Sequence, residues 1–258
     1  MKSAKLGQNF LVNRSIATKI VDAVLPVAGN PIEIGPGKGI LTERLLQKRS
    51  PSDPKLTVIE VDPQLADQLQ ERFPQDLNII RQDVLTLNVD ETFPKEPLTL
   101  VGNLPYYISK DIADWLIAHH HRVEKGVFML QKEFVDKLVR VKQSPQSLMF
   151  SYLFDARVLF NVSPGSFNPS PKVFSSVFQF IHRWNIPEAD INPQSLYRLL
   201  KISYQNRRKT LQNNLSPHYS KLTVTTALTH LDIPPTTRAE QLSLKKFLDL
   251  YRQLEKIS

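Results

Sequence analysis

The chain has 258 residues, 41% of them hydrophobic and 22% charged, with a net charge of +8, a composition typical of a globular protein with room for one large and one small domain. It contains no cysteine, which excludes disulfides and cysteine-ligated zinc or iron–sulfur sites and leaves no sign of an oxidising compartment. Because the first residues carry no apolar signal core and no run of about 18 apolar residues occurs, we expect a cytoplasmic protein without a membrane span.

Predicted strands and helices alternate through most of the chain. Helices are predicted over 15–25 and directly after the glycine-rich turn 35–39. Strands are predicted over 31–34, 56–62, 77–84, 98–102, 126–130, 156–162 and 175–181. Since strands that alternate with helices favour right-handed crossovers, the sequence predicts an α/β fold with a doubly wound, mostly parallel sheet.

The last part of the chain differs in composition. Residues 183–258 hold 12 Lys and Arg against 6 Asp and Glu, whereas residues 1–182 hold 21 against 19, and no glycine follows Gly165. Helices are predicted here over 193–203, 207–215, 222–231 and 241–254. We therefore predict a large domain over 1–184 and a small, all-helical, basic domain over 185–258 that suits a polyanion partner. A solvated basic surface without a partner is the alternative.

Four predicted strands end at residues that can bind a ligand, namely Gly35, Glu60, Asp83 and Asn103. In a doubly wound sheet, ligands bind at the carboxyl ends of the strands. A lone carboxylate at a strand end is more often simply solvated, but these residues follow successive strands and together predict one shared site.

The glycine-rich turn favours a particular kind of ligand. The turn 35–39 lets a ligand approach the backbone at a helix N-terminus. A dinucleotide fingerprint would place its third glycine at Ile40, and Glu33 makes the turn acidic, so a cationic amino-acid group fits better than a pyrophosphate. Glu60 is placed to accept both hydroxyls of a ribose, and Asp83 is placed to reach an adenine.

The segment Asn103-Leu104-Pro105-Tyr106 suits the capture of a flat heterocycle that bears an amino group. The Asn103 side-chain oxygen and the backbone carbonyl of Leu104, held by the rigid Pro105, can accept hydrogen bonds from that amine. Tyr106 can stack on the ring.

These motifs resemble those of a known family. Residues 33–42 resemble motif one of the S-adenosylmethionine-dependent methyltransferases, which have a Rossmann-like fold. With residues 103–106, the chain is similar to the ribosomal RNA adenine dimethyltransferase family. The similarity continues in order through the segments 7–11, 129–133, 167–173 and 206–215, and so covers nearly the whole chain.

The resemblance implies roles for individual residues. S-adenosylmethionine would be contacted by Asn9, Leu11, Gly35, Glu60, Asp83 and Asn103, with residues 8–11 as a lid and 1–184 as the catalytic domain. For Phe10, we favour packing against the first helix. Phe167 is a candidate for the second face of the target base, with core packing as an equal alternative, and Lys172 could hold the target phosphate. Tyr107 stands where these enzymes often have asparagine, and Lys110-Asp111 replace a small residue and proline.

The tail holds the densest basic cluster. Its members are Arg207, Arg208 and Lys209, with Arg198 and Lys201 nearby and Tyr204 interleaved. We interpret this cluster as a surface that contacts RNA phosphates; a charged helix face packed on the catalytic domain is the alternative. The consecutive residues 119–121 are all histidine, point in different directions on a helix and cannot ligate one metal, so we expect no metal.

The sequence thus predicts an S-adenosylmethionine-dependent enzyme that dimethylates adenines of small-subunit ribosomal RNA. The family resemblance implies that the targets are the 6-amino groups of two adjacent adenines, in a hairpin loop near the 3′ end of that RNA. We expect a monomer that acts within an assembling subunit. The alternatives are the macrolide-resistance branch that modifies large-subunit RNA, a non-catalytic nucleic-acid-binding relative and, more distantly, a nicotinamide oxidoreductase.

Overall fold

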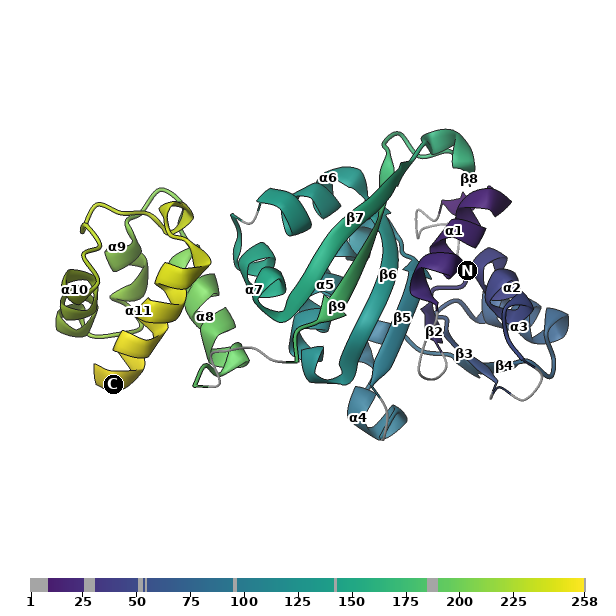
Figure 1. Ribbon diagram of the computed structural model, residues 1–258, viewed down its shortest axis with the longest axis horizontal. Coiled ribbons are helices and arrows are strands. Elements are labelled where there is room, and N and C mark those ends of the chain that lie inside the picture. Colours follow the sequence, from purple (N-terminus) through teal and green to yellow (C-terminus); the bar gives the residue numbers. More distant parts are fainter. Residues whose placement is uncertain are drawn as a thin grey trace. The chain divides into compact units, whose positions relative to one another are not determined.

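The computed structural model describes residues 9–25, 31–50, 53, 55–94, 97–141, 143–184 and 190–257 (Figure 1). They form two compact units, the first from 1–139 and 154–182 and the second from 140–153 and 183–258. Residues 7 and 8 of the N-terminal motif, and residues 185–187 beside the predicted domain boundary, lie outside the described residues.

The first unit is built on a seven-stranded sheet with the order β4-β3-β2-β5-β6-β9-β7. Its strands are β2 (Pro31–Ile34), β3 (Leu56–Ile59), β4 (Leu77–Ile80), β5 (Leu98–Asn103), β6 (Val123–Gln131), β7 (Phe154–Val162) and β9 (Ser175–His182). The strands from β4 to β6 pair in parallel, whereas β9 pairs antiparallel with both β6 and β7. The prediction of a mostly parallel, doubly wound sheet is confirmed. Its order reverses at β2, the position at which such sheets bind ligands.

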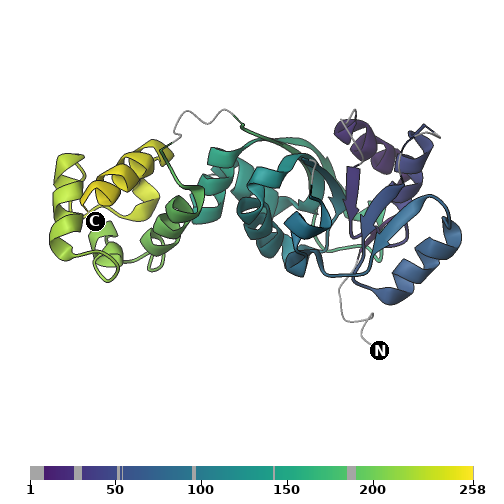
Figure 2. The same ribbon diagram turned by 90° about the horizontal axis from the view of Figure 1, so that it is seen from below.

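The two faces of the sheet are covered by different helices. One face packs against α1 (Arg14–Val24), α2 (Ile40–Gln47) and α3 (Pro63–Arg72), and Val127 and Met129 of β6 belong to this core. Phe128, between them, points to the other face, where its ring meets the edges of Phe178 and Phe180. Figure 1 and Figure 2 together place α1 and α5 (Ser109–Ala118) on opposite faces of the sheet.

The helix ends follow from capping residues. The Asn13 side chain accepts a hydrogen bond from the Ile16 backbone at the start of α1, and Asp62 does the same for Gln64 at the start of α3. The strand predicted over 56–62 therefore ends early, because Asp62 already caps the next helix.

The remaining elements are short or belong to the second unit. They are β1 (Phe10–Leu11), β8 (Phe167–Asn168), α4 (Val89–Thr92), α6 (Lys132–Val135), α7 (Pro145–Leu153), α8 (Pro193–Ser203), α9 (Leu211–Leu215), α10 (Lys221–His230) and α11 (Leu244–Ile257). Single turns are η2 (Val84–Thr86), η3 (Tyr106–Ile108), η4 (His120–Arg122), η6 (Pro164–Ser166) and η7 (Ala239–Gln241), and η5 (Asp136–Val141) is a π-helix. No helix among the described residues is both long and apolar enough to cross a lipid bilayer.

The second unit differs from the prediction in two ways. It includes α7, which lies between β6 and β7 in the sequence, whereas the predicted division assigned all residues up to 184 to the first domain. The helix predicted over 207–215 begins only at Leu211, because the Thr210 hydroxyl caps it by accepting from the Asn213 backbone. The basic cluster is therefore in a turn.

Candidate functional site

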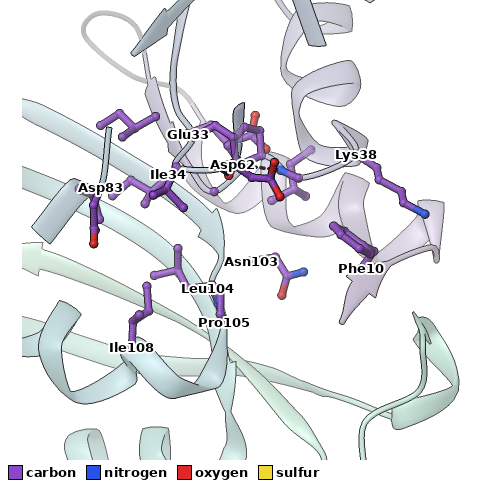
Figure 3. A pocket seen from close by; sticks show the side chains of 18 of the residues that line it. Phe10, Glu33, Ile34, Lys38, Asp62, Asp83, Asn103, Leu104, Pro105 and Ile108 are labelled. Carbon is purple, nitrogen blue, oxygen red and sulfur yellow. Dashed lines mark hydrogen bonds between the residues drawn. The ribbon is translucent and has the colours of Figure 1, made fainter. Parts of the chain in front are cut away.

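A cavity of about 860 Å³ lies at the carboxyl ends of the parallel strands in the first unit (Figure 3). All six residues predicted to bind S-adenosylmethionine line it, which are Asn9, Leu11, Gly35, Glu60, Asp83 and Asn103. Leu104, Pro105, Tyr106 and Phe167 line it as well. The fold thus brings the predicted cofactor residues and the predicted catalytic segment into one cavity, at the place where the sheet order reverses.

The glycine-rich turn after β2 forms one wall. Gly35 and Gly37 have φ angles of 64° and 56°, a left-handed conformation that side chains disfavour. A Cβ atom on Gly37 would lie 3.1 Å from the ring of Phe10. Glycine is therefore needed here both for the turn and for the approach of the N-terminal segment.

Glu60 holds this turn against the end of β3. Its Oε2 accepts a hydrogen bond from the Gly37 backbone at 3.1 Å, and its Oε1 accepts one from the Asp62 backbone at 2.9 Å. Burial raises the pKa of Glu60, and these two backbone donors oppose that rise. Each carboxylate oxygen has a second lone-pair position, so both can still accept hydrogen bonds from a ligand.

Glu33, on β2, is the most deeply buried carboxyl group of the cavity wall, with 1% of its surface exposed. The Thr42 hydroxyl donates to its Oε2 at 2.7 Å. Burial raises the pKa of Glu33 to about 8, the nearby charge of Glu60 adds to the rise, and the Thr42 hydrogen bond opposes it. Glu33 is thus suited to a cationic ligand group, whose charge would favour its ionised form.

Asp83 lies at one end of the cavity. Figure 3 shows it on the same side as Ile108, while Phe10 and Lys38 lie at the opposite end. The Asp83 side chain is exposed, and its Oδ1 accepts a hydrogen bond from the Leu85 backbone at 3.0 Å. Its carboxylate is therefore fixed by this cap and open to the cavity.

The segment 103–106 is held in place from several sides. The Asn103 side-chain amide donates from Nδ2 to the Asn9 carbonyl at 3.3 Å, and the Leu104 backbone donates to the Met129 carbonyl at 3.2 Å. The Tyr106 hydroxyl shares a hydrogen bond with Ser175 Oγ at 2.6 Å. Burial raises the pKa of Tyr106, so its phenol is neutral at physiological pH. The catalytic segment predicted from the sequence is thus rigidly positioned.

The N-terminal segment closes the end of the cavity opposite Asp83. Strand β1 pairs antiparallel with β8, so that Phe10 faces Asn168 and Leu11 faces Phe167. The Phe10 ring lies in the cavity wall, with Lys38 Nζ 4.8 Å from its centroid. Phe167 is buried in the core and also lines the cavity, so the core-packing alternative describes part of its role.

The basic residues predicted to contact RNA phosphates lie outside the cavity. Lys172 is exposed on the loop between β8 and β9 and does not line the cavity. In the second unit, the basic turn (Arg207, Arg208 and Lys209) is exposed between α8 and α9, and Arg198 and Lys201 are exposed on α8.

Tyr204 is not part of this surface. It is buried, and its hydroxyl donates to the Ala239 carbonyl at 3.2 Å. Burial raises the pKa of Tyr204 to about 12. Tyr204 lies between the basic residues in the sequence but not on their exposed surface, because its ring packs in the core of the second unit, beside Phe247.

Sequence reasoning missed a histidine pair in the first unit. His120 Nδ1 lies 3.0 Å from His182 Nε2, the two rings stack, and burial lowers the pKa of His120 to about 4. These residues are far apart in the sequence, so no local spacing could have indicated the contact. Across the part of the chain that the structure describes, no group of three or more His, Asp or Glu side chains is arranged to hold a metal ion.

Comparisons with known proteins agree on one family. A family model described as ribosomal RNA adenine dimethylase matches residues 1–256. The ribosomal RNA small subunit methyltransferase A of Acidobacterium capsulatum is 36% identical over 263 residues, which cover 97% of this chain and 90% of that protein. The protein of the same name from Hahella chejuensis is 36% identical over 253 residues, which cover 95% and 89%.

Two solved structures resemble the whole chain. A dimethyladenosine transferase from Plasmodium falciparum has a TM-score of 0.79 at 26% identity and matches 96% of this chain and 98% of its own. The 23S rRNA methyltransferase ErmE has a TM-score of 0.70 at 25% identity and matches 96% of this chain and 100% of its own.

Proposed function

We propose that this chain, which belongs to the ribosomal RNA adenine dimethylase family, transfers methyl groups from S-adenosylmethionine to adenines of small-subunit ribosomal RNA. One observation carries the proposal: a single cavity joins the ligand-binding ends of β2, β3 and β4 to the amine-binding segment at the end of β5. We further propose that the targets are two adjacent adenines in a hairpin loop near the 3′ end of that RNA. The protein would act as a cytoplasmic monomer on an assembling subunit.

The cavity fits the parts of S-adenosylmethionine. Both Glu60 oxygens can accept ribose hydroxyls at their remaining lone pairs, and Asp83 can accept from an adenine amine. The turn at Gly35 and the buried Glu33 suit the charged amino-acid part. Asn9 and Leu11 close the cavity from the N-terminal segment. The bound cofactor would supply an electrophilic methyl group.

The segment 103–106 would hold the target adenine. Because Asn103 Nδ2 donates to the Asn9 carbonyl, its Oδ1 is available to accept a hydrogen bond from the adenine amine, and the Leu104 carbonyl can accept the second. Adenine's amino nitrogen is a poor nucleophile because its lone pair is delocalised into the ring. Two acceptors favour a pyramidal nitrogen, direct its lone pair toward the methyl group and stabilise the developing positive charge.

Tyr106 would stack on the target base, which contributes roughly 1–3 kcal/mol to binding. Its hydroxyl is fixed by Ser175, so the ring is already held in place before RNA binds. A general base is not required, since the methylated ammonium is acidic and loses its proton readily. The monomethyl amine still has one N–H to donate and can bind again, whereas the dimethyl amine has none, so transfer should stop at two.

The basic residues of the second unit would orient the RNA. The basic turn together with Arg198 and Lys201 presents five exposed cationic side chains on one segment of the chain. Such contacts are to phosphates and set position rather than sequence. Lys172, exposed on a loop that follows Phe167, would contact the phosphate of the target nucleotide.

The experiment that tests this function supplies isotope-labelled S-adenosylmethionine to small and large ribosomal subunits that lack their own adenine dimethylation. Digested nucleosides are then identified by mass. We expect labelled dimethyladenosine in the small-subunit RNA only. Asn103→Ala should abolish it, whereas Asn78→Ala, an exposed amide on β4 outside the cavity, should not.

Two other outcomes would each contradict the proposal. Label in the large-subunit RNA would place the chain with the activity named for ErmE. Retained RNA binding without any label would instead indicate a non-catalytic nucleic-acid-binding protein.

A further inference from the structure

Tyr107 directly follows the catalytic segment, yet its surroundings differ from those of Tyr106. Both residues lie on η3 and line the cavity. Successive residues of such a turn point about 120° apart, because it has about three residues per turn. Tyr106 is fixed by Ser175 on β9, whereas 57% of Tyr107 is exposed. Among the described residues, none forms a hydrogen bond with the Tyr107 hydroxyl. The two tyrosine side chains therefore point in different directions and have different surroundings.

Tyr107 lines the cavity together with Asp83 and Glu60, and α5, which begins two residues after it, packs against η2, which begins directly after Asp83. Ile108, the next residue, lies on the same side of the cavity as Asp83 in Figure 3. Burial raises the pKa of Tyr107, and the charges of Asp83 and Glu60 raise it further, so its phenol is a neutral donor at physiological pH. Asp83 and Glu60 are the two residues that fit an adenosine.

We propose that Tyr107 is a cofactor-binding residue, whose ring covers the adenosine of bound S-adenosylmethionine at the end of the cavity formed by Glu60 and Asp83. This inference rests on the proposed function, because it assigns a residue to that cofactor. A half-exposed ring at a cavity wall gains favourable contact when a flat base covers it. The asparagine that the related enzymes often carry here offers a hydrogen bond but no aromatic face.

Two neighbouring tyrosines would then hold the target adenine of the RNA and the adenine of the cofactor. Tyr106 stacks on the target base, and Tyr107 stacks on the adenosine of the cofactor. Because both are on one short turn, the cofactor and the target would be positioned by the same rigid element between β5 and α5.

The test measures binding of S-adenosylhomocysteine and of free adenosine to the full chain by isothermal titration calorimetry. We expect Tyr107→Ala to weaken both by about tenfold, which corresponds to about 1.4 kcal/mol. Tyr107→Phe keeps the ring and should weaken both only a few-fold. The matched control is Phe174→Ala, since Phe174 is a similarly exposed aromatic residue (52%) of the same unit that does not line the cavity, and its affinities should not change. Unfolding temperatures without ligand verify that each variant is folded.

Kinetic constants separate the cofactor from the RNA. With Tyr107→Ala, we expect KM for S-adenosylmethionine to rise, while kcat at saturating cofactor and KM for the RNA stay within about twofold. Unchanged affinity of Tyr107→Ala for S-adenosylhomocysteine would overturn the inference, as would a loss confined to RNA affinity, which would assign the ring to the RNA. If the wild-type chain failed to bind S-adenosylhomocysteine at all, the proposed function itself would fail.

Discussion

The buried carboxyl group of Glu33 gives the most quantitative prediction. Burial raises the pKa of Glu33 from 4.5 to about 8 in the folded chain, whereas the unfolded chain has the lower value. Folding therefore takes up a proton between these two pH values. The contribution of Glu33 to the free energy of unfolding is therefore most favourable below pH 4.5, and this advantage is lost as the pH rises through about 8. A change of 1 in pKa corresponds to about 1.4 kcal/mol, so the upper limit of the loss is about 5 kcal/mol.

Glu33→Gln removes this titration and keeps the shape of the side chain. The amide oxygen of glutamine can still accept the hydrogen bond from Thr42. We expect the wild type and the variant to have similar free energies of unfolding near pH 5. At pH 9, the variant should be the more stable by up to about 5 kcal/mol. Urea unfolding of the ligand-free proteins at pH 5, 7 and 9 measures this difference. The contributions of the other titrating groups are the same in both proteins and cancel in it.

Cofactor affinity should depend on pH in the opposite direction and increase as the pH rises. A cationic ligand next to Glu33 favours the carboxylate, so binding at pH 7 should release a proton from this group. Calorimetry in buffers of different ionisation enthalpy should detect about one more proton released by the wild type than by Glu33→Gln. The affinity of the wild type should increase from pH 6 to pH 9, and that of the variant should be lower and flatter. This reasoning would be refuted if the free energy of unfolding depended on pH equally in the two proteins and if both released the same number of protons on binding the ligand.

Three further predictions concern the catalytic amide, the turn and the RNA surface. Asn103→Ala should abolish methyl transfer and weaken S-adenosylhomocysteine binding only a few-fold, as measured by radiolabel incorporation and calorimetry; near-normal turnover would contradict the assigned role. Gly37→Ala should destabilise the chain by about 1–2 kcal/mol, because φ is 56° and the new Cβ meets the Phe10 ring at 3.1 Å; an unchanged unfolding midpoint would contradict this. Replacing all three residues of the basic turn with glutamine should weaken RNA binding and lower the slope of log K against log salt by about 2. An unchanged salt slope would mean that this turn does not contact phosphates.

Elements with strong local signals were predicted well. Strand β2 lies at residues 31–34 as expected, because an apolar run there ends directly in a glycine-rich turn. Helix α8 likewise matches its predicted range 193–203, since Asn192 caps it and Pro193 occupies its first turn. The sequence also predicted that the ends of β2, β3, β4 and β5 lie side by side. This prediction rested on the rule that strands alternating with helices form a parallel sheet with right-handed crossovers, and the observed strand order agrees with it.

Features that depend on distant contacts could not be predicted. Strand β1 pairs with β8, and these two short segments are far apart in the sequence. Each has only two residues, too few to show the alternating hydrophobic pattern of a strand. The turn before α9 is another case. Good helix formers at 207–209 suggested a helix, but the Asn214 side chain donates to the carbonyls of Ser203 and Asn206 and holds this stretch as a turn. The raised pKa of Glu33 likewise depends on burial, which the sequence indicates only indirectly.

In the proposed mechanism, the contact between Asn103 and Asn9 links the N-terminal segment to the amide that binds the target amine. An amide side chain has one oxygen acceptor, and its nitrogen can only donate. With Nδ2 bound to the Asn9 carbonyl, rotation of the Asn103 amide by 180° would place two carbonyl oxygens against each other. The N-terminal segment therefore fixes the orientation in which Oδ1 can accept from the target amine. Since Asn9 also lines the cavity, a change that displaces the N-terminal segment would disturb both the cavity wall and the orientation of the Asn103 amide.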